Sequence, residues 1–315
     1  MSLQFADFDA DGHEDIVTAT FEGTAFLCRG SEDGWLPPEH FVDGQDRNIV
    51  LSLFYDMEAN AYANADRSPE GVENAEDHCV SAMVMDWDAD GDLDLLLGAK
   101  EGRLYLQHNE GERGAPKFTG VNHLLEAGGE PFSVPGGLTA ARPVDWDDDG
   151  LTDLVCGSFA GGAYLYRNIG RPDAPAFSAP LTLLGPASAT GDGSAGPESG
   201  WYVDPRDYDG DGDLDLLVGG HFNFVPETRV LNDEEKALLA ELEAQYEQIG
   251  EELTAAYEAA EKAGGEEAVA EYTSSEEYGE LVERMMKVRE QLMDLKPEPS
   301  RESGVWLYRR NDRPQ

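Results

Sequence analysis

The sequence has few basic residues. Its 315 residues include 22 Lys and Arg against 65 Asp and Glu, so the formal net charge at pH 7 is −43. Nucleic acids and anionic membrane surfaces carry charge of the same sign and would repel such a chain. The composition therefore excludes nucleic acid as a default partner and disfavours binding to anionic membranes.

Cysteines and long apolar runs are also scarce. Three cysteines, Cys28, Cys79 and Cys156, form no disulfide framework, and two of them fall within apolar strand patterns that indicate buried thiols. No run is apolar and long enough for membrane insertion, and no signal peptide is expected ahead of the first motif described below. Histidines that could act as general bases are scattered singly: His40, His78, His108, His123 and His221.

Aspartate is abundant and recurs in one fixed spacing. The pattern D-x-D-x-D-G-x-x-D begins at residues 7, 86, 145 and 207, so the chain is an array with a unit of roughly 60 residues. A single copy would fit a solvated acidic turn, but four copies with one spacing indicate a shared task. The aspartates are Asp7, Asp9, Asp11 and Asp15; Asp86, Asp88, Asp90 and Asp94; Asp145, Asp147, Asp149 and Asp153; and Asp207, Asp209, Asp211 and Asp215.

Crowded carboxylates repel one another unless a cation lies among them, and oxygen ligands in a flexible loop suit Ca²⁺. We therefore predict that all of these aspartates are metal ligands and that the chain holds about four Ca²⁺ ions. Position 7 of the motif varies too much to act by its side chain, so its carbonyl is the expected ligand. Glycine at position 6 allows the sharp reversal of the loop.

The loops are not EF-hands. An EF-hand would place a bidentate Glu at position 12 and continue into a helix. Short apolar runs that read as buried strands follow each motif instead. Position 12 is occupied by Thr18, Leu97, Cys156 and Val218.

Position 2 of each motif is aromatic. A ring at the same place in every repeat is typical of packing between repeats, and stacking on a sugar is the alternative. The residues are Phe8, Trp87, Trp146 and Tyr208.

The loops resemble those of FG-GAP and VCBS repeats, known from the β-propeller of integrin α chains and from many secreted bacterial proteins. The resemblance covers about 250 residues, and it lies in the calcium loops. The Phe-Gly and Gly-Ala-Pro signatures are not intact, and "LGAK" at Leu97 is the nearest remnant. The bacterial secreted type of repeat is therefore favoured over an integrin relative.

Short strands at regular spacing with glycine turns predict an all-β fold, a β-propeller of about four blades. In repeats two and three each metal loop joins the first two of four expected strands. The fourth repeat shows no outermost strand, so the expectation includes a small ring, an incomplete ring or a chain that has lost residues at one end.

The last blade is predicted to contain an inserted antiparallel helical hairpin. Asn232 and Glu235 fit a capping box, and apolar residues then recur in steps of three and four until Gly264 and Gly265 stop the helix. A second helix is expected from near Ser274 to Pro297, and the two narrow apolar seams would pair like a short coiled coil. The predicted parts are residues 1–231 for blades 1–4, 232–297 for the hairpin and 298–315 for the return strand.

Connections between successive antiparallel strands alternate between the two faces of a blade. The hairpin and the long links at 58–78 and 185–200 are therefore expected on the face opposite the calcium loops, which is the predicted place for a protein or carbohydrate ligand.

The favoured function is an extracellular, periplasmic or cell-surface scaffold that calcium stabilises and that binds protein or glycan without catalysis. The location follows from the metal, because loops of about 10⁻⁴ to 10⁻³ M affinity need extracellular calcium. The helical hairpin is a candidate for self-association. The alternative is a carbohydrate-active enzyme, since some polysaccharide lyases are built on propellers that resemble these repeats.

Overall fold

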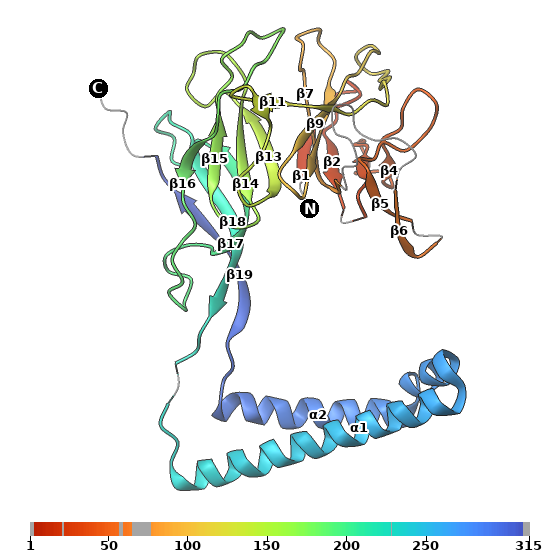
Figure 1. Cartoon of the computed structure of the whole chain (residues 1–315). Helices are drawn as coiled ribbons and strands as arrows, with labels where there is room; N and C mark the ends of the chain where they lie inside the picture. The colour runs from red at the N-terminus through yellow and green to blue at the C-terminus, as the bar shows by residue number, and fades with distance from the viewer. Residues whose placement is uncertain (1–2, 21, 57–58, 65–76, 228, 311–315) are drawn as a thin grey trace. The chain divides into compact units, whose positions relative to one another are not determined.

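Strands form where short apolar runs alternate with glycine turns. The computed structural model describes residues 3–20, 22–56, 59–64, 77–227 and 229–310. These residues are mostly in antiparallel sheets, together with two long helices (Figure 1). The chain divides into two compact units, a sheet unit of Met1–Phe222 with Glu302–Gln315 and a helical unit of Asn223–Arg301.

Four sheets, numbered 1 to 4 along the chain, make up most of the sheet unit. In each of them consecutive strands pair in antiparallel order. Sheet 1 is β1 (Leu3–Ala6), β2 (Asp15–Ala19), β3 (Ala25–Cys28) and β4 (Glu39–His40), and sheet 2 is β7 (Cys79–Met85), β8 (Asp94–Ala99), β9 (Leu104–Gln107) and β10 (His123–Leu124). Sheet 3 is β13 (Leu138–Val144), β14 (Asp153–Ser158), β15 (Ala163–Tyr166) and β16 (Leu181–Leu184), and sheet 4 is β17 (Ser199–Arg206), β18 (Asp215–Phe224) and β19 (Ser300–Tyr308).

Burial differs between the inner and the outer sheets of this series. Every residue of β8 and β14 is buried, whereas buried and partly exposed residues alternate along β2. Side chains of a strand point alternately to its two faces, so sheets 2 and 3 are covered on both faces and sheet 1 mainly on one. Repeats two and three have uninterrupted apolar runs because both faces of these strands are covered.

Three apolar cores join the four sheets in series. Val17 and Leu27 of sheet 1 pack with Leu95 and Leu97 of sheet 2. The alternate residue of β8, Leu96, faces sheet 3 in the second core. The third core joins sheet 3 to Trp201, Val203 and other residues of sheet 4. Each sheet therefore packs on the next one along the chain.

Two short hairpins lie outside the four main sheets. The 58–78 link contains β6 (Ala61–Asn64), which pairs with β5 (Leu53–Asp56) as a hairpin, and its residues 65–76 lie outside the described residues. A second short hairpin, β11 (Glu126–Ala127) with β12 (Glu130–Pro131), lies between sheets 2 and 3 in sequence. Sheet 4 has three strands within the described residues, and residues 311–315 are not among them.

The helical unit contains α1 (Asp233–Thr273) and α2 (Glu276–Leu295), which pack along a narrow apolar seam. The capping box is confirmed: the Asn232 side chain accepts from the Glu235 N–H at 2.9 Å, and the Glu235 carboxylate accepts from the Asn232 N–H at 2.9 Å. The buried residues of the seam are Leu242, Ile249, Leu281 and Val288, which recur seven residues apart in each helix, as the predicted steps of three and four require.

Two details of the helices differ from the sequence-based expectation. Gly264 and Gly265 break the helical geometry, with a φ of 63° at Gly265, but the chain resumes the helix and continues to Thr273. The second helix is capped by Ser275 and not Ser274, because the Ser275 hydroxyl accepts from the Tyr278 N–H. No helix within the described residues has the length and apolar character needed to cross a membrane.

Candidate metal centres

Each aspartate motif forms the loop between the first and second strands of one main sheet. Position 4 of all four loops has positive φ, as does the glycine at position 6. A Cβ at the position-6 glycines would meet no atom within 4 Å, so the backbone angle and not lack of space requires glycine there. The position-4 residues are Ala10 (58°), Ala89 (59°), Asp148 (57°) and Gly210 (77°).

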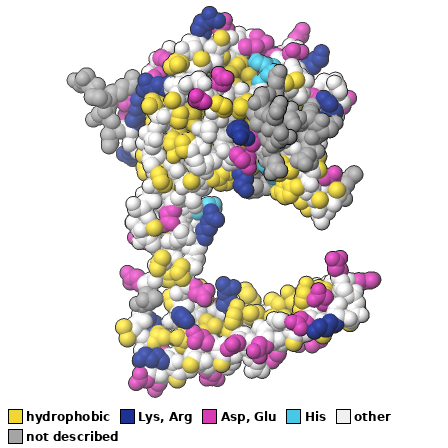
Figure 2. Space-filling model, viewed as in Figure 1, with side chains coloured by type: hydrophobic (Ala, Val, Ile, Leu, Met, Phe, Trp, Pro, Cys, Tyr) yellow, Lys and Arg dark blue, Asp and Glu magenta, His cyan; other side chains and the backbone are white. Residues whose placement is uncertain are grey.

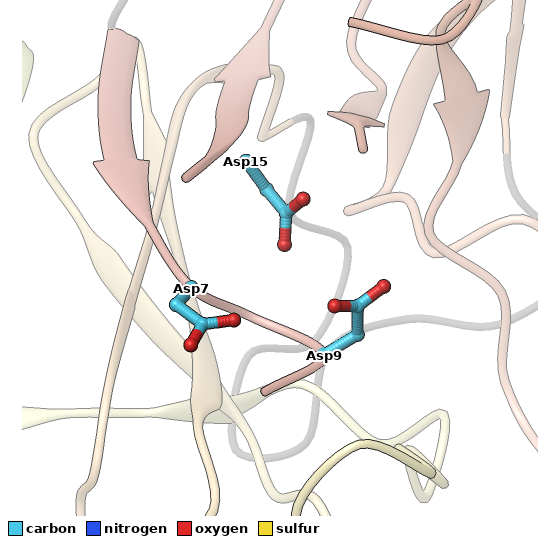
Figure 3. Close-up of side chains that lie close together, drawn as sticks. All are labelled: Asp7, Asp9 and Asp15. Atoms are coloured by element: carbon cyan, nitrogen blue, oxygen red, sulfur yellow. The ribbon is translucent and has the colours of Figure 1, made fainter. Parts of the chain in front are cut away.

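Three carboxylates converge in every loop. One oxygen from each of the three lies within 4.8 Å of the others. In loop 7–15, Asp7 and Asp9 follow β1, and Asp15 opens β2 and faces them (Figure 3). The other groups are Asp86, Asp88 and Asp90; Asp145, Asp147 and Asp149; and Asp207, Asp209 and Asp215.

Four of the predicted ligands lie outside these groups of three, namely Asp11, Asp94, Asp153 and Asp211. Asp11 and Asp211 stand at position 5 of the motif, where the carboxylate turns onto the loop's own backbone. Asp11 accepts from the His13 N–H at 2.8 Å, and Asp211 accepts from the Asp213 N–H at 2.9 Å. Asp90 and Asp149 accept equivalent bonds, so this turn belongs to all four loops.

The aspartate at position 9 is buried in every loop and holds two backbone segments. One oxygen accepts from the N–H of the position-2 aromatic residue, at 2.9 to 3.2 Å. The other accepts from an N–H two residues beyond the third strand, at 2.6 to 2.9 Å. The four residues Asp15, Asp94, Asp153 and Asp215 are at most 1% exposed, and their second donors are Gly30, Asn109, Asn168 and Arg310.

Several carboxylate oxygens in the loops are buried without a hydrogen-bond partner. They are Asp7 Oδ1 in the first loop, Asp88 Oδ1 and Asp92 Oδ1 in the second and Asp147 Oδ1 in the third. Burial, together with repulsion from Asp90, Asp94, Asp88 and Asp86, raises the pKa of Asp92 to about 6. Unpartnered anionic oxygens of this kind fit a bound cation, and their chemistry suits Ca²⁺.

An arginine that the sequence motif does not predict lies beside three of the loops. Arg29 pairs with Asp9 at 2.5 Å, Arg167 with Asp147 at 3.5 Å and Arg309 with Asp209 at 3.6 Å. Each arginine follows the third strand, 20 residues after position 3 in the first and third repeats, and the hairpin lengthens that interval in the fourth. The second repeat has His108 at this place, 3.6 Å from Asp94.

Three of the four position-2 aromatics pack between sheets, as the favoured interpretation predicts. Phe8 stacks on Phe118 of the second repeat at 6.3 Å between ring centroids, and Trp87 lies 5.9 Å from Phe177 of the third. The Arg310 guanidinium lies 5.0 Å from the ring centroid of Trp146. Tyr208 of the last sheet is 38% exposed, and its hydroxyl donates to Asp204 at 2.7 Å.

Residues 145–218, which span the third metal loop to the fourth, match the FG-GAP-like repeat. The same loop, with its buried position-9 aspartate, occurs twice more ahead of the matched FG-GAP region. No curated protein matches the chain.

Among solved structures, the chain is similar to the chain described as BBS1N in complex with ARL6DN, in crystals soaked with lead or with mercury. The identities are 11% and 12%, and each match covers 69% of this chain and 75% of the other. The TM-score is 0.28 in both cases, so this likeness supports no conclusion about fold or partner.

The position-9 aspartate should stabilise the fold even without metal. Replacing Asp153 by Ala leaves the buried N–H groups of Trp146 and Asn168 without their acceptor and should lower the free energy of unfolding by about 3 kcal/mol in EGTA. Asp149→Ala is the control, because Asp149 is exposed and loses one bond from Leu151, which should cost about 1 kcal/mol or less. Urea unfolding measures both, and equal losses would contradict the assigned role of Asp153.

Proposed function

We propose that the chain is a calcium-stabilised β-propeller that serves as a non-catalytic binding scaffold. The observation that carries the calcium assignment is the fourfold convergence of three carboxylate oxygens within 4.8 Å, together with buried oxygens that lack a partner in three of the loops. Bound Ca²⁺ would neutralise this crowded charge. The aspartates at positions 1, 3, 5 and 9 are the proposed ligands, with the position-7 carbonyl.

Two observations support the propeller arrangement. Four sheets in chain order pack each on the next, which is how blades succeed one another in a propeller. The first strands of sheets 1, 3 and 4 line a common cavity of about 640 Å³, in the place that a propeller gives to its central channel. Its lining includes Gln4, Arg142 and Asp204. We propose an incomplete ring, since three apolar cores join the four sheets within the described residues.

The described residues offer little to catalysis. Two cavities place a tyrosine beside cationic groups, one of about 370 Å³ lined by Tyr308, Arg309 and Arg310 and one of about 300 Å³ lined by Tyr246, Arg289 and Lys296. Burial raises the pKa of Tyr308, which disfavours the phenolate that a base requires, and Arg309 already pairs with Asp209. The His108 and His123 rings lie 5.7 Å apart, so these two histidines are paired and not scattered as the sequence suggested. Neither ring lines the cavity at Tyr308. The scaffold is therefore preferred to a lyase.

We place the protein outside the cytosol, in a periplasmic, cell-surface or extracellular setting. Loops of this kind plausibly bind with Kd of about 10⁻⁴ to 10⁻³ M, which extracellular calcium satisfies. The ligand, a protein or a glycan, would bind on the face opposite the calcium loops. The 185–200 link between β16 and β17 belongs to that face by strand order.

The helical hairpin is the proposed self-association element. The seam between the two helices buries four residues and leaves other apolar side chains exposed to solvent. Among these, the exposed fraction is 43% for Leu238, 46% for Tyr257 and 60% for Met286. Figure 2 shows hydrophobic side chains between the acidic ones along this unit. A second copy of the hairpin would cover them, and the shared negative charge would oppose that pairing unless salt screens it.

Calcium should raise the melting temperature of the chelator-stripped protein. One site with Kd near 10⁻⁴ M in about 1 mM Ca²⁺ contributes roughly 1.4 kcal/mol, so four sites should shift the transition by about 10 °C or more. Thermal unfolding followed by circular dichroism in Ca²⁺, in Mg²⁺ and in EGTA measures this. A melting temperature that is unchanged by EGTA would overturn the calcium assignment.

Glycan binding should be visible on a broad glycan array and should weaken when EGTA removes the ion that orders the loops. The matched control is Asp153→Asn, which disturbs the buried aspartate that accepts from the Trp146 and Asn168 N–H groups. It shows how binding changes when one loop loses its local order. An array without any calcium-dependent signal would contradict the glycan form of the scaffold. Turnover of an acidic polysaccharide by the same preparation would instead establish the lyase.

Replacing residues 232–297 by a short Gly-Ser linker should convert an oligomer into a monomer, as measured by light scattering. Because the hairpin is acidic, association of the intact chain should strengthen as salt rises. Retention of the calcium-dependent melting transition in the deletion variant would show that the sheet unit still folds. An unchanged mass would contradict self-association through the hairpin.

A further inference from the structure

The four loops are not equivalent at position 7. Asp92 in the second loop is 4% exposed, and its Oδ1 has no hydrogen-bond partner. It lies close enough to Asp86, Asp88, Asp90 and Asp94 for all four to repel its charge. An acidic side chain held out of water beside four others, with an oxygen left unpartnered, fits a bound cation.

The fourth loop provides the comparison, because it also has aspartate at position 7. Asp213 is partly exposed, whereas Asp92 is buried. The first and third loops have His13 and Leu151 at this position. The same residue type at the same motif position is therefore buried among its neighbours in one loop only.

The loops also differ in the cation that the protein itself supplies. Arg29, Arg167 and Arg309 each pair with the position-3 aspartate of their own loop. In the second repeat this place belongs to His108, which lies 3.6 Å from Asp94. A guanidinium is permanently charged and partly neutralises a loop, and the second repeat has no arginine at this position.

We propose that loop 86–94 is the highest-affinity calcium site of the chain and that the Asp92 side chain is an additional ligand there. This inference rests on the proposed calcium function. The affinity of carboxylate loops rises with the number of charged ligands, and loop 86–94 combines a buried position-7 aspartate with the absence of an arginine where the other loops have one. The loop joins β7 to β8 in sheet 2, which is buried on both faces, so an ion here stabilises the centre of the array.

Calorimetric titration of the chelator-stripped protein with Ca²⁺ at pH 8 tests the assignment. The wild-type chain should show one site tighter than the rest. Asp92→Asn should weaken that site about tenfold or more, since it removes a charged ligand of nearly the same shape. Asp213→Asn is the matched control, and it should leave the tightest site unchanged.

The same pair of variants gives a second measurement that does not depend on binding. In EGTA, Asp92→Asn removes a buried and repelled charge, so its melting temperature should exceed that of the wild type. In saturating Ca²⁺ the order should reverse. Asp213→Asn should match the wild type in EGTA. A variant that raises the metal-free melting temperature is necessarily folded, which excludes misfolding as the cause of weak binding.

His108→Arg tests the contribution of the missing guanidinium. It should weaken the tightest site, because the arginine would neutralise part of the loop as it does in the other repeats.

Equal effects of Asp92→Asn and Asp213→Asn on a wild-type chain that binds Ca²⁺ would overturn this inference and leave the calcium function standing. A wild-type chain that gives no heat with Ca²⁺ and no shift in EGTA would overturn both.

Discussion

A buried aspartate that accepts two backbone hydrogen bonds is the interaction on which each repeat depends. In all four loops the position-9 carboxylate links the loop after the first strand, the start of the second strand and the segment after the third. Charge-assisted bonds of this kind are stronger than neutral ones, and burial makes their loss costly. The loop geometry is therefore held by protein atoms, and the other carboxylates of each loop are brought close together.

The same aspartates explain why the four repeated loops could be predicted from the sequence. Loop geometry depends on local spacing, so neither the glycine at position 6 nor the crowding of the motif's carboxylates requires knowledge of distant contacts. The capping box at Asn232 was predictable for the same reason, because it lies within one helical turn. The burial of β8 and β14 was predictable as well, because each strand is an uninterrupted apolar run.

What the sequence did not reveal depends on contacts between segments far apart in the chain. The arginines beside the loops follow the third strand, and in sheet 4 the helical unit separates Arg309 from Asp209, so no local pattern marks the pair. Burial of Asp92 but not Asp213 depends on the packing around each sheet and not on the motif, which is identical at both. The helix beyond Gly265 forms although glycine at positive φ normally ends a helix, because the residues that follow are again good helix formers.

The place of the helical unit within sheet 4 affects the order in which the sheet unit can assemble. In the first three repeats, 15 residues separate the position-9 aspartate from the N–H group after the third strand that donates to it. In the fourth repeat the two partners, Asp215 and Arg310, are 95 residues apart. For a flexible chain, closing a loop of 95 residues costs about 1.6 kcal/mol more free energy than closing one of 15 residues. Helices that form early within it shorten the effective path, so the hairpin would act as a folding aid that draws β19 back to β18, and sheet 4 would be the last of the four to be completed.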